Sequence, residues 1–192
     1  MAHATRRTQF FRRFAHARRG AVAVEFAFVA FPFLLLLFGT LELALVLMVS
    51  MTLETATGDA ARAIRTGEFQ TSGGNTKADF QTLVCDRMMW LKSSCKDKLS
   101  VDVETFAIND FQAMANSGTR NTQTFDKNAT CFSPGGPMDV VMVRTYYEWT
   151  LFTPLLNDAL VNAGNNKRLI NAVVSFRNEP FNNNSPVGAR CT

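Results

Sequence analysis

The chain has 192 residues, of which 47% are hydrophobic and 19% charged, and its formal net charge at pH 7 is +4. The first 20 residues hold six arginines and no acidic residue, so the remaining residues carry a net charge of −2. A basic sequence ordinarily indicates a nucleic-acid partner. Here the positive charge is confined to the first 20 residues and the rest of the chain is nearly neutral, which argues against such a partner.

Residues 1–20 have the composition of a cytoplasmic leader. Their arginines precede a long apolar stretch, and positive charge before a membrane-spanning helix keeps that end of the chain in the cytoplasm. The arginines that set this topology are Arg6, Arg7, Arg12, Arg13, Arg18 and Arg19. We therefore predict a cytoplasmic N-terminus and export of the rest of the chain.

The stretch Phe26–Val49 is apolar except for Thr40 and Glu42. At about 1.5 Å per residue, a helix of this length covers roughly 36 Å, more than the hydrocarbon core of about 30 Å. We predict one membrane-spanning helix, bent near Pro32 because proline removes a backbone hydrogen bond. Glu42 is expected at the far membrane interface or against a partner helix. A twin-arginine signal and a cleaved Sec signal are both disfavoured, because the apolar run is too long for either.

A processing motif lies at the junction of the leader and the helix. Gly20 is followed by Ala21 and, after three further residues, by Glu25 and Phe26, which gives the pattern G-x-x-x-x-E-F. With its basic leader, this pattern resembles the processing site of type IV pilin-like proteins, which are cut on the cytoplasmic side after the glycine. The resemblance implies a mature chain that starts at Ala21 and a Glu25 that meets the N-terminal amine of a neighbouring subunit. The alternative is that Glu25 sits at the lipid headgroups.

Beyond the membrane the helix is predicted to continue to about residue 66, because apolar residues recur at helical spacing and Gly67 is suited to end the helix. The later elements are expected to be a loop at 67–77, a helix at 78–93, strands at 99–106, 138–149 and 169–176, a polar loop at 109–137 and a short helix at 154–161. The second strand carries apolar groups on both faces, which predicts a central position in the sheet.

These elements define an α+β fold class, in which a long N-terminal transmembrane helix continues into a small exported domain with a mainly antiparallel sheet. The expected organisation has three parts. Residues 1–20 are an Arg-rich cytoplasmic leader, residues 21–66 are the transmembrane and stalk helix, and residues 67–192 are a periplasmic α+β domain.

The four cysteines are Cys85, Cys95, Cys131 and Cys191, and all lie on the predicted exported side, where disulfides persist. Four cysteines allow three connectivities, which the sequence does not separate. We favour Cys85–Cys95, which staples the second helix to the following loop, and Cys131–Cys191, which ties the tail to the loop before the central strand. A zinc site is disfavoured, because no C-x-x-C spacing occurs and both histidines lie in the leader.

No catalytic site is expected. A mature chain without the leader has no histidine, which excludes Ser-His-Asp and Cys-His arrangements. Acids that could serve a glycosidase-like site are Asp97, Asp102, Glu104, Asp110 and Asp139. They are scattered along the chain, and we expect the alternating acids of the strand at 99–106 to be solvated. We therefore predict that the protein is not an enzyme and uses no metal or cofactor.

Three stretches together resemble TadE-like proteins, pseudopilins of the tight-adherence (Flp) pilus assembly system. They are the leader junction and helix at 18–45, the cysteine-bearing helix and strand at 85–106, and the strand-rich part at 134–156 followed by 173–181. The resemblance implies processing by a prepilin peptidase after Gly20 and a single-pass location in the bacterial inner membrane.

By the same resemblance, the protein assists assembly of Flp pili used for surface attachment. Its partners are then the inner membrane, other pilin-like subunits and the Tad secretion machinery. The alternative is an uncleaved bitopic inner-membrane protein whose periplasmic domain binds a partner. In that case Gly20 and Glu25 are dispensable.

Overall fold

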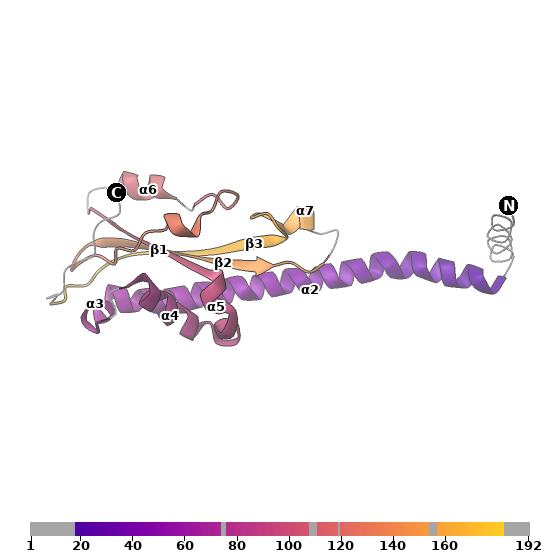
Figure 1. The fold of residues 1–192 in the computed structure, drawn as a ribbon, viewed down its shortest axis with the longest axis horizontal. Helices are drawn as coiled ribbons and strands as arrows, with labels where there is room; N and C mark the ends of the chain where they lie inside the picture. The colour runs from indigo at the N-terminus through magenta and orange to yellow at the C-terminus, as the bar shows by residue number, and fades with distance from the viewer. Residues whose placement is uncertain (1–17, 74–75, 108–110, 119, 154–156, 183–192) are drawn as a thin grey trace, which may run out of the picture. The chain divides into compact units, whose positions relative to one another are not determined.

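The computed structural model describes residues 18–73, 76–107, 111–118, 120–153 and 157–182 (Figure 1). The chain divides into two compact units, Met1–Leu43 and Ala44–Thr192. The elements are α2 (Arg18–Arg65), α3 (Glu68–Thr71), α4 (Lys77–Arg87), η1 (Met89–Leu91), α5 (Lys92–Lys98), β1 (Leu99–Phe106), α6 (Phe111–Ser117), η2 (Lys127–Ala129), β2 (Val140–Thr150), α7 (Asn157–Leu160) and β3 (Lys167–Arg177). A long apolar helix is thus followed by a small domain with a three-stranded antiparallel sheet, and the predicted α+β class is confirmed.

Helix α2 has 48 residues and is helical throughout, including at Pro32. The Thr40 hydroxyl donates a hydrogen bond to the Leu37 carbonyl at 2.8 Å, so this polar group of the apolar run is satisfied within the helix. The helix ends where predicted. Gly67 follows with φ +77°, and its N–H donates to the Ile64 carbonyl at 3.1 Å. A left-handed glycine that closes the last turn is a common helix terminator.

The sheet has the order β1-β2-β3, with both pairs antiparallel. The central position predicted for the second strand is therefore confirmed, and β1 coincides with the predicted range 99–106. One face of the sheet is covered by the second half of α2 together with α4 and α5, and the other by α6 and the segment before β2 (Figure 1). Because both faces of β2 are covered, seven consecutive residues of this strand, 141–147, are buried.

The core lies between α2 and the sheet. Buried residues recur along α2 at helical spacing, and the stripe consists of Val46, Val49, Leu53, Ala56, Ala60 and Ile64. It packs on strand residues that point to the same side, including Val101, Val103, Val141, Val143 and Tyr147. Inside this contact the hydroxyl oxygens of Thr57 and Thr145 lie 2.7 Å apart, which joins α2 to the central strand by a buried hydrogen bond.

The helix predicted at 78–93 is not continuous, because it is interrupted after Arg87. Helix α4 begins at Lys77, after a capping box formed by Thr76 and Asp79, and ends at Arg87. The chain then reverses through Met89, whose φ is +46°, before α5 resumes. The reason is the Cys85–Cys95 disulfide, whose Cα atoms are 5.5 Å apart. A continuous helix would separate these atoms by about 15 Å.

Two of the predicted loops contain short helices. The range 67–77 holds α3, in which buried Phe69 packs edge to face on Phe80 of α4, with ring centroids 5.6 Å apart. The range 109–137 holds α6 and η2. These helices are too short for their sequence periodicity to be visible, and tertiary packing fixes them.

Candidate functional site: the apolar surface of α2

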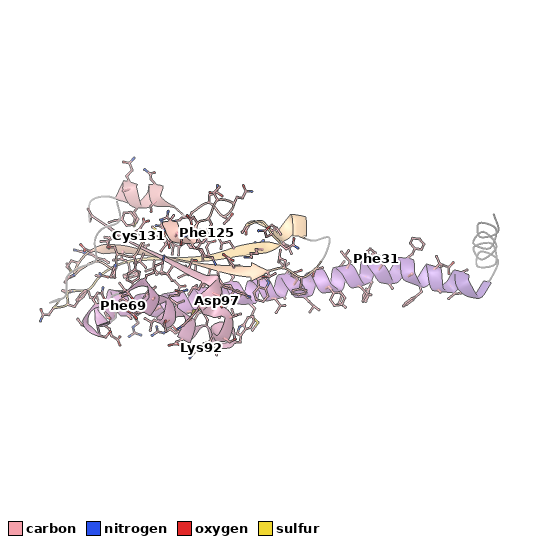
Figure 2. All side chains as sticks on the ribbon, viewed as in Figure 1. Phe31, Phe69, Lys92, Asp97, Phe125 and Cys131 are labelled. Atoms are coloured by element: carbon pink, nitrogen blue, oxygen red, sulfur yellow. A yellow bond between two sulfur atoms is a disulfide. The ribbon has the colours of Figure 1, made fainter. Side chains whose placement is uncertain are left out.

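The first unit presents an apolar surface formed by α2. Its exposed large side chains are Val22, Val24, Phe26, Phe28, Val29, Phe31, Phe33, Leu34, Leu36, Leu37, Phe38, Leu41 and Leu43. In Figure 2 the labelled Phe31 projects away from the helix axis. Consecutive exposed positions such as 36, 37 and 38 point in different directions round a helix, so the surface is apolar on all sides rather than on one stripe.

Such a surface has no cover within the unit. Among the described residues one helix is long and apolar enough to cross a membrane, with a mean hydropathy of 2.4 over a window that is entirely unburied. The core helix of a soluble domain would bury at least one face. The candidate span lies near the N-terminus and fits a single-pass membrane protein.

The predicted processing residues lie at the start of this helix. Helix α2 begins at Arg18, so Gly20, Ala21, Glu25 and Phe26 are all helical. Ala21 and Glu25 are exposed, and Phe26 is 73% exposed. Of the topology arginines, Arg18 and Arg19 have helical backbones, whereas Arg6, Arg7, Arg12 and Arg13 lie outside the described residues.

Glu25, which precedes the apolar run, and Glu42, which lies within it, have opposite surroundings. Glu42 is completely buried, although its neighbours Leu41 and Leu43 are about half exposed. Glu25 is exposed, four residues after Ala21. Of these two acids, Glu25 is therefore the one that is open to lipid or to another chain.

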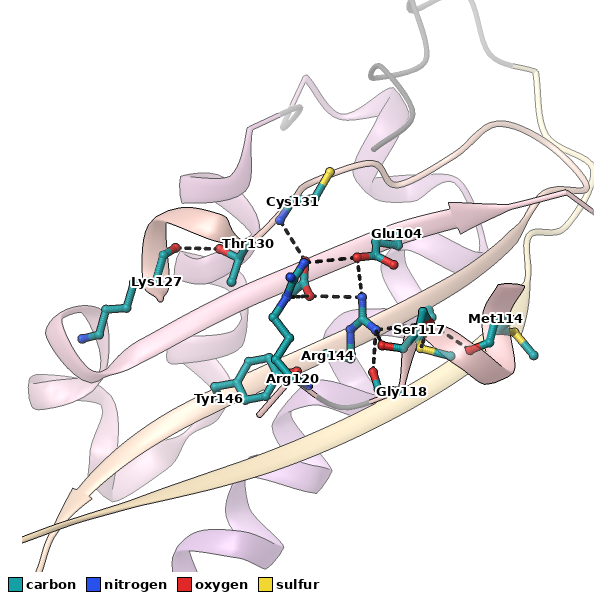
Figure 3. Close-up of polar contacts among 12 residues, drawn as sticks. Glu104, Met114, Ser117, Gly118, Arg120, Lys127, Thr130, Cys131, Arg144 and Tyr146 are labelled. Atoms are coloured by element: carbon teal, nitrogen blue, oxygen red, sulfur yellow. Dashed lines mark hydrogen bonds and ion pairs between the residues drawn. The ribbon is translucent and has the colours of Figure 1, made fainter. Parts of the chain in front are cut away.

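The prediction that the acids of β1 are solvated is wrong. Asp102 is completely buried, and the Glu104 side chain is 17% exposed. Both lie on the sheet face that α6 and the following segment cover. Two arginines reach them there: Arg144, from the central strand, and Arg120, from the segment after α6 (Figure 3).

The four charged groups form one network. The Nη2 atom of Arg144 lies 3.1 Å from Oδ2 of Asp102 and 2.5 Å from Oε1 of Glu104. The Nε atom of Arg120 donates to Oδ2 of Asp102 at 2.8 Å, and its Nη2 atom lies 3.3 Å from Oε1 of Glu104. The Asp102 carboxylate also accepts a hydrogen bond at Oδ1 from the backbone N–H of Cys131, at 2.8 Å.

This network fastens the segment between α6 and β2 to the sheet. Arg144 also donates through Nη1 to the carbonyls of Ser117 and Gly118, at 3.0 and 2.6 Å. The hydrogen bond to Asp102 raises the pKa of Arg120, and burial raises the pKa of Tyr146, whose hydroxyl accepts the Arg120 backbone N–H at 3.0 Å. Each carboxylate is held by two guanidinium groups.

The remaining predicted acids do not join this network. Asp139 accepts the Gly136 N–H at 2.8 Å within the turn before β2, Asp97 is exposed, and Asp110 lies outside the described residues. Sequence reasoning missed Arg144 as the partner of the acids. The available signal was a charged residue in the middle of a strand predicted to be central, because a buried arginine requires a paired carboxylate.

Two of the four cysteines, Cys85 and Cys95, form a disulfide, as predicted. Cys191 lies outside the described residues, so its pairing with Cys131 stays a prediction. Within the part of the chain that the structure describes, no three His, Cys, Asp or Glu side chains gather in a group that could hold a metal ion.

In the part of the chain that the structure describes, the helix and the domain define a class: a small α+β domain that follows one candidate membrane span. Residues 20–62 match the family described as TadE-like protein. Over this segment, which contains the apolar surface of α2 and most of its buried stripe, the resemblance predicted from the sequence is confirmed. Comparison with curated proteins and with solved structures gives no match.

Proposed function

We propose that this protein is a TadE-like minor pseudopilin or assembly factor for Flp (tight-adherence) pili, which mediate surface attachment. Helix α2 anchors it in the bacterial inner membrane, with the N-terminus in the cytoplasm and the α+β domain in the periplasm. One observation carries the proposal: the segment that matches the TadE-like family exposes an apolar surface on all sides, with the exposed acid Glu25 near its start. The role is structural and involves no catalysis.

Glu25 is the residue through which this surface recognises a neighbour. A carboxylate in the membrane costs several kcal/mol unless it is protonated or paired. After cleavage between Gly20 and Ala21, each chain carries a new N-terminal amine at the same end of the span. Pairing of Glu25 with the amine of a neighbouring pilin-like subunit removes the cost and fixes the register between the two helices.

Processing by a prepilin peptidase removes the leader, residues 1–20, with its topology arginines. Gly20 is helical in the structure, so the peptidase has to unwind the first turn before it can cut. Glycine is the weakest helix former apart from proline, by about 1 kcal/mol relative to alanine. The first turn is therefore easiest to open at this position.

The mature chain then has two parts. Residues 21–66 form the transmembrane and stalk helix, and residues 67–192 form the periplasmic domain. The stalk residues from Ala44 onward belong to the same compact unit as the domain. The pilin-like subunits and the Tad secretion machinery meet the apolar surface of α2, and the domain stands on the periplasmic side.

A second candidate function is that of an uncleaved bitopic anchor whose periplasmic domain binds a partner. The helical conformation of Gly20 favours this candidate, because a peptide bond inside a helix is a poor protease substrate. The two candidates differ in their use of Glu25, which only the pseudopilin requires.

The test is complementation of a strain that lacks this protein, with assembled pili and surface attachment as readouts. The variant Glu25→Ala is compared with Glu54→Ala, which removes an exposed acid of the same helix outside the apolar surface. We expect Glu25→Ala to lower piliation at least about tenfold, equivalent to about 1.4 kcal/mol of assembly free energy, at equal membrane levels. The control should assemble normally. Normal piliation with Glu25→Ala contradicts the proposal and favours the bitopic anchor.

A further inference from the structure

Exposed apolar side chains continue along α2 beyond the length that a membrane needs. A hydrocarbon core needs about 20 residues, fewer than the predicted apolar stretch Phe26–Val49 supplies. Counted from Val22, the first exposed large apolar residue of α2, the span ends near Leu41. Leu47, Met48 and Met51 lie beyond it in the second unit and are between 51% and 69% exposed. From the next turn onward the exposed positions of α2 are polar, namely Glu54, Thr55, Asp59, Arg62 and Arg65. The apolar surface of the second unit therefore stops at one level along the helix.

The direction of β2 shows what else lies at this level. The Arg65 carbonyl accepts the Glu179 N–H, and the Asp139 carbonyl accepts the Asn178 N–H, both at 2.8 Å. These bonds place the start of β2 at the end of α2. Further along, Thr145 meets Thr57. Strand β2 thus runs antiparallel to α2, and its arrowhead in Figure 1 points toward the N-terminal side of the helix.

The end of β2 brings further apolar groups to the same level. From Thr145 to Trp149 the strand advances about 13 Å, which corresponds to about nine helical residues before Thr57, close to Met48. The Trp149 ring lies 6.4 Å from that of Trp90 in η1, edge to face. Trp90 is 44% exposed, its neighbour Met89 is 80% exposed, and Phe152, which follows β2, is 55% exposed.

We infer that these side chains dock on the lipid bilayer at the boundary between headgroups and acyl chains on the side of the domain. The set comprises Leu47, Met48, Met51, Met89, Trp90 and Phe152, and we call it the interfacial collar. The inference rests on the proposed membrane span, because Ala44, the first residue of this unit, follows the span directly and holds this end of the domain at the bilayer by chain connection alone.

A lipid surface fits the collar better than a partner helix does. The collar draws on three separate segments, α2, η1 and the residues after β2, rather than following one helix axis. A plane contacts such a set, whereas a helix contacts a stripe. Tryptophan is enriched at the headgroup level of membranes.

The test uses the two tryptophans of the chain as depth probes. The full chain is reconstituted into phospholipid vesicles that carry bromine either near the ester carbonyls or near the acyl ends. In the variant Trp149→Phe, Trp90 is the fluorophore, and we expect shallow bromines to remove most of its emission and deep bromines little. If Trp149→Phe proves unstable, the emission lost between wild type and Trp90→Phe reports Trp90 instead.

A matched control separates this inference from the proposed function. Phe33→Trp, placed in the Trp90→Phe/Trp149→Phe background, puts a fluorophore in the middle of the span. If deep bromines quench this control but no brominated lipid quenches Trp90, the interfacial collar is contradicted and the membrane span is supported. A control that no brominated lipid quenches overturns both.

Discussion

Arg144 and Asp102 occupy paired positions on β2 and β1, with Nη2 and Oδ2 3.1 Å apart. The Arg144 side chain is 1% exposed and the Asp102 side chain is not exposed at all. Charges so far from water are retained only when each finds its counterpart, and here Arg120 and Glu104 complete a neutral set of four. The pair ties the two strands together and also holds the segment that covers them.

Replacing Arg144 with methionine should destabilise the domain strongly. The change keeps most of the side-chain volume but leaves Asp102 with only Arg120 and the Cys131 N–H. Breaking a buried pair in this way costs about 3–5 kcal/mol of stability. Because Arg120 and the Cys131 N–H still contact Asp102, we expect a loss near the lower end of this range. The measurement is the free energy of unfolding from denaturant titration in detergent, followed by tryptophan fluorescence.

The control for this change is Arg177→Met. Arg177 is an exposed arginine at the end of β3, and its Nε donates to the Met138 carbonyl at 3.0 Å. A surface substitution of this kind typically changes stability by about 0.5 kcal/mol or less. Equal losses for the two variants would show that the buried network contributes no special stability.

Glu148 gives the stability a dependence on pH. Burial alone would raise its pKa, but hydrogen bonds from Lys127 and Lys167, both at 2.8 Å, lower it below the ordinary value of 4.5. A lowered pKa in the folded state means that the interaction stabilises the fold above pH 4.5 and is lost as the pH falls through the folded-state pKa. The two lysines are partly exposed, so solvent screening keeps the effect below about 1 kcal/mol.

The measurement is the melting temperature of wild type and Glu148→Gln at neutral pH and near pH 3, where unpaired carboxyls are protonated. At neutral pH, wild type should have a higher melting temperature than Glu148→Gln. Near pH 3 this difference between the two proteins should be smaller. A difference of the same size at both values would contradict the assigned ion pairs.

The Cys85–Cys95 disulfide closes a short loop, with a sequence separation of 10. Loop-closure entropy for this length predicts a contribution of about 3 kcal/mol. The double variant Cys85→Ser/Cys95→Ser should therefore unfold at lower denaturant than wild type. Peptide mapping without reductant supplies the control, since it must recover these two cysteines in one linked fragment. Recovery of Cys85 linked to another cysteine would refute the assignment.

Gly67 and Gly58 should respond in opposite directions to alanine. Gly67 has φ +77°, and a Cβ there would overlap the Phe181 ring. The left-handed conformation alone costs a non-glycine residue about 1–2 kcal/mol, so Gly67→Ala should lower the free energy of unfolding by at least that amount. Gly58 lies within α2, and a Cβ would meet nothing within 4 Å.

For that reason Gly58→Ala should stabilise the protein by up to about 1 kcal/mol, the difference in helix propensity. Both variants are compared by thermal unfolding in the same detergent. A stabilising Gly67→Ala, or a destabilising Gly58→Ala, would be inconsistent with the backbone described here.

Sequence patterns were sufficient for the long elements. Helical spacing in α2, alternation in β1 and the two apolar faces of β2 each reflect a periodicity that the backbone imposes over many residues. The Arg144–Asp102 pair was not predictable in the same way. Strand register is a tertiary property, and a polar residue on an alternating strand looks the same whether it faces water or a buried partner.

The break after α4 was in fact implied by another prediction. A helix reaching residue 93 would carry the chain about 12 Å from Cys85. Two further residues span at most about 7 Å, so Cys95 would have to run straight back along the helix, fully extended, to reach a Cα distance of 5.5 Å. The predicted helix and the predicted disulfide were therefore in conflict. Covalent geometry is a stronger constraint than helical periodicity, so the break should have been inferred from the cysteines.

The most direct test of the pseudopilin account is the N-terminus of the membrane-extracted protein, measured by intact mass and terminal sequencing with and without the cognate prepilin peptidase. The account predicts a chain that starts at Ala21 when the peptidase is present and keeps its leader when it is absent. A leader retained in both cases would contradict processing and favour the uncleaved anchor. A start beyond Met51 would show that the apolar run is a secretion signal and would contradict the membrane span itself.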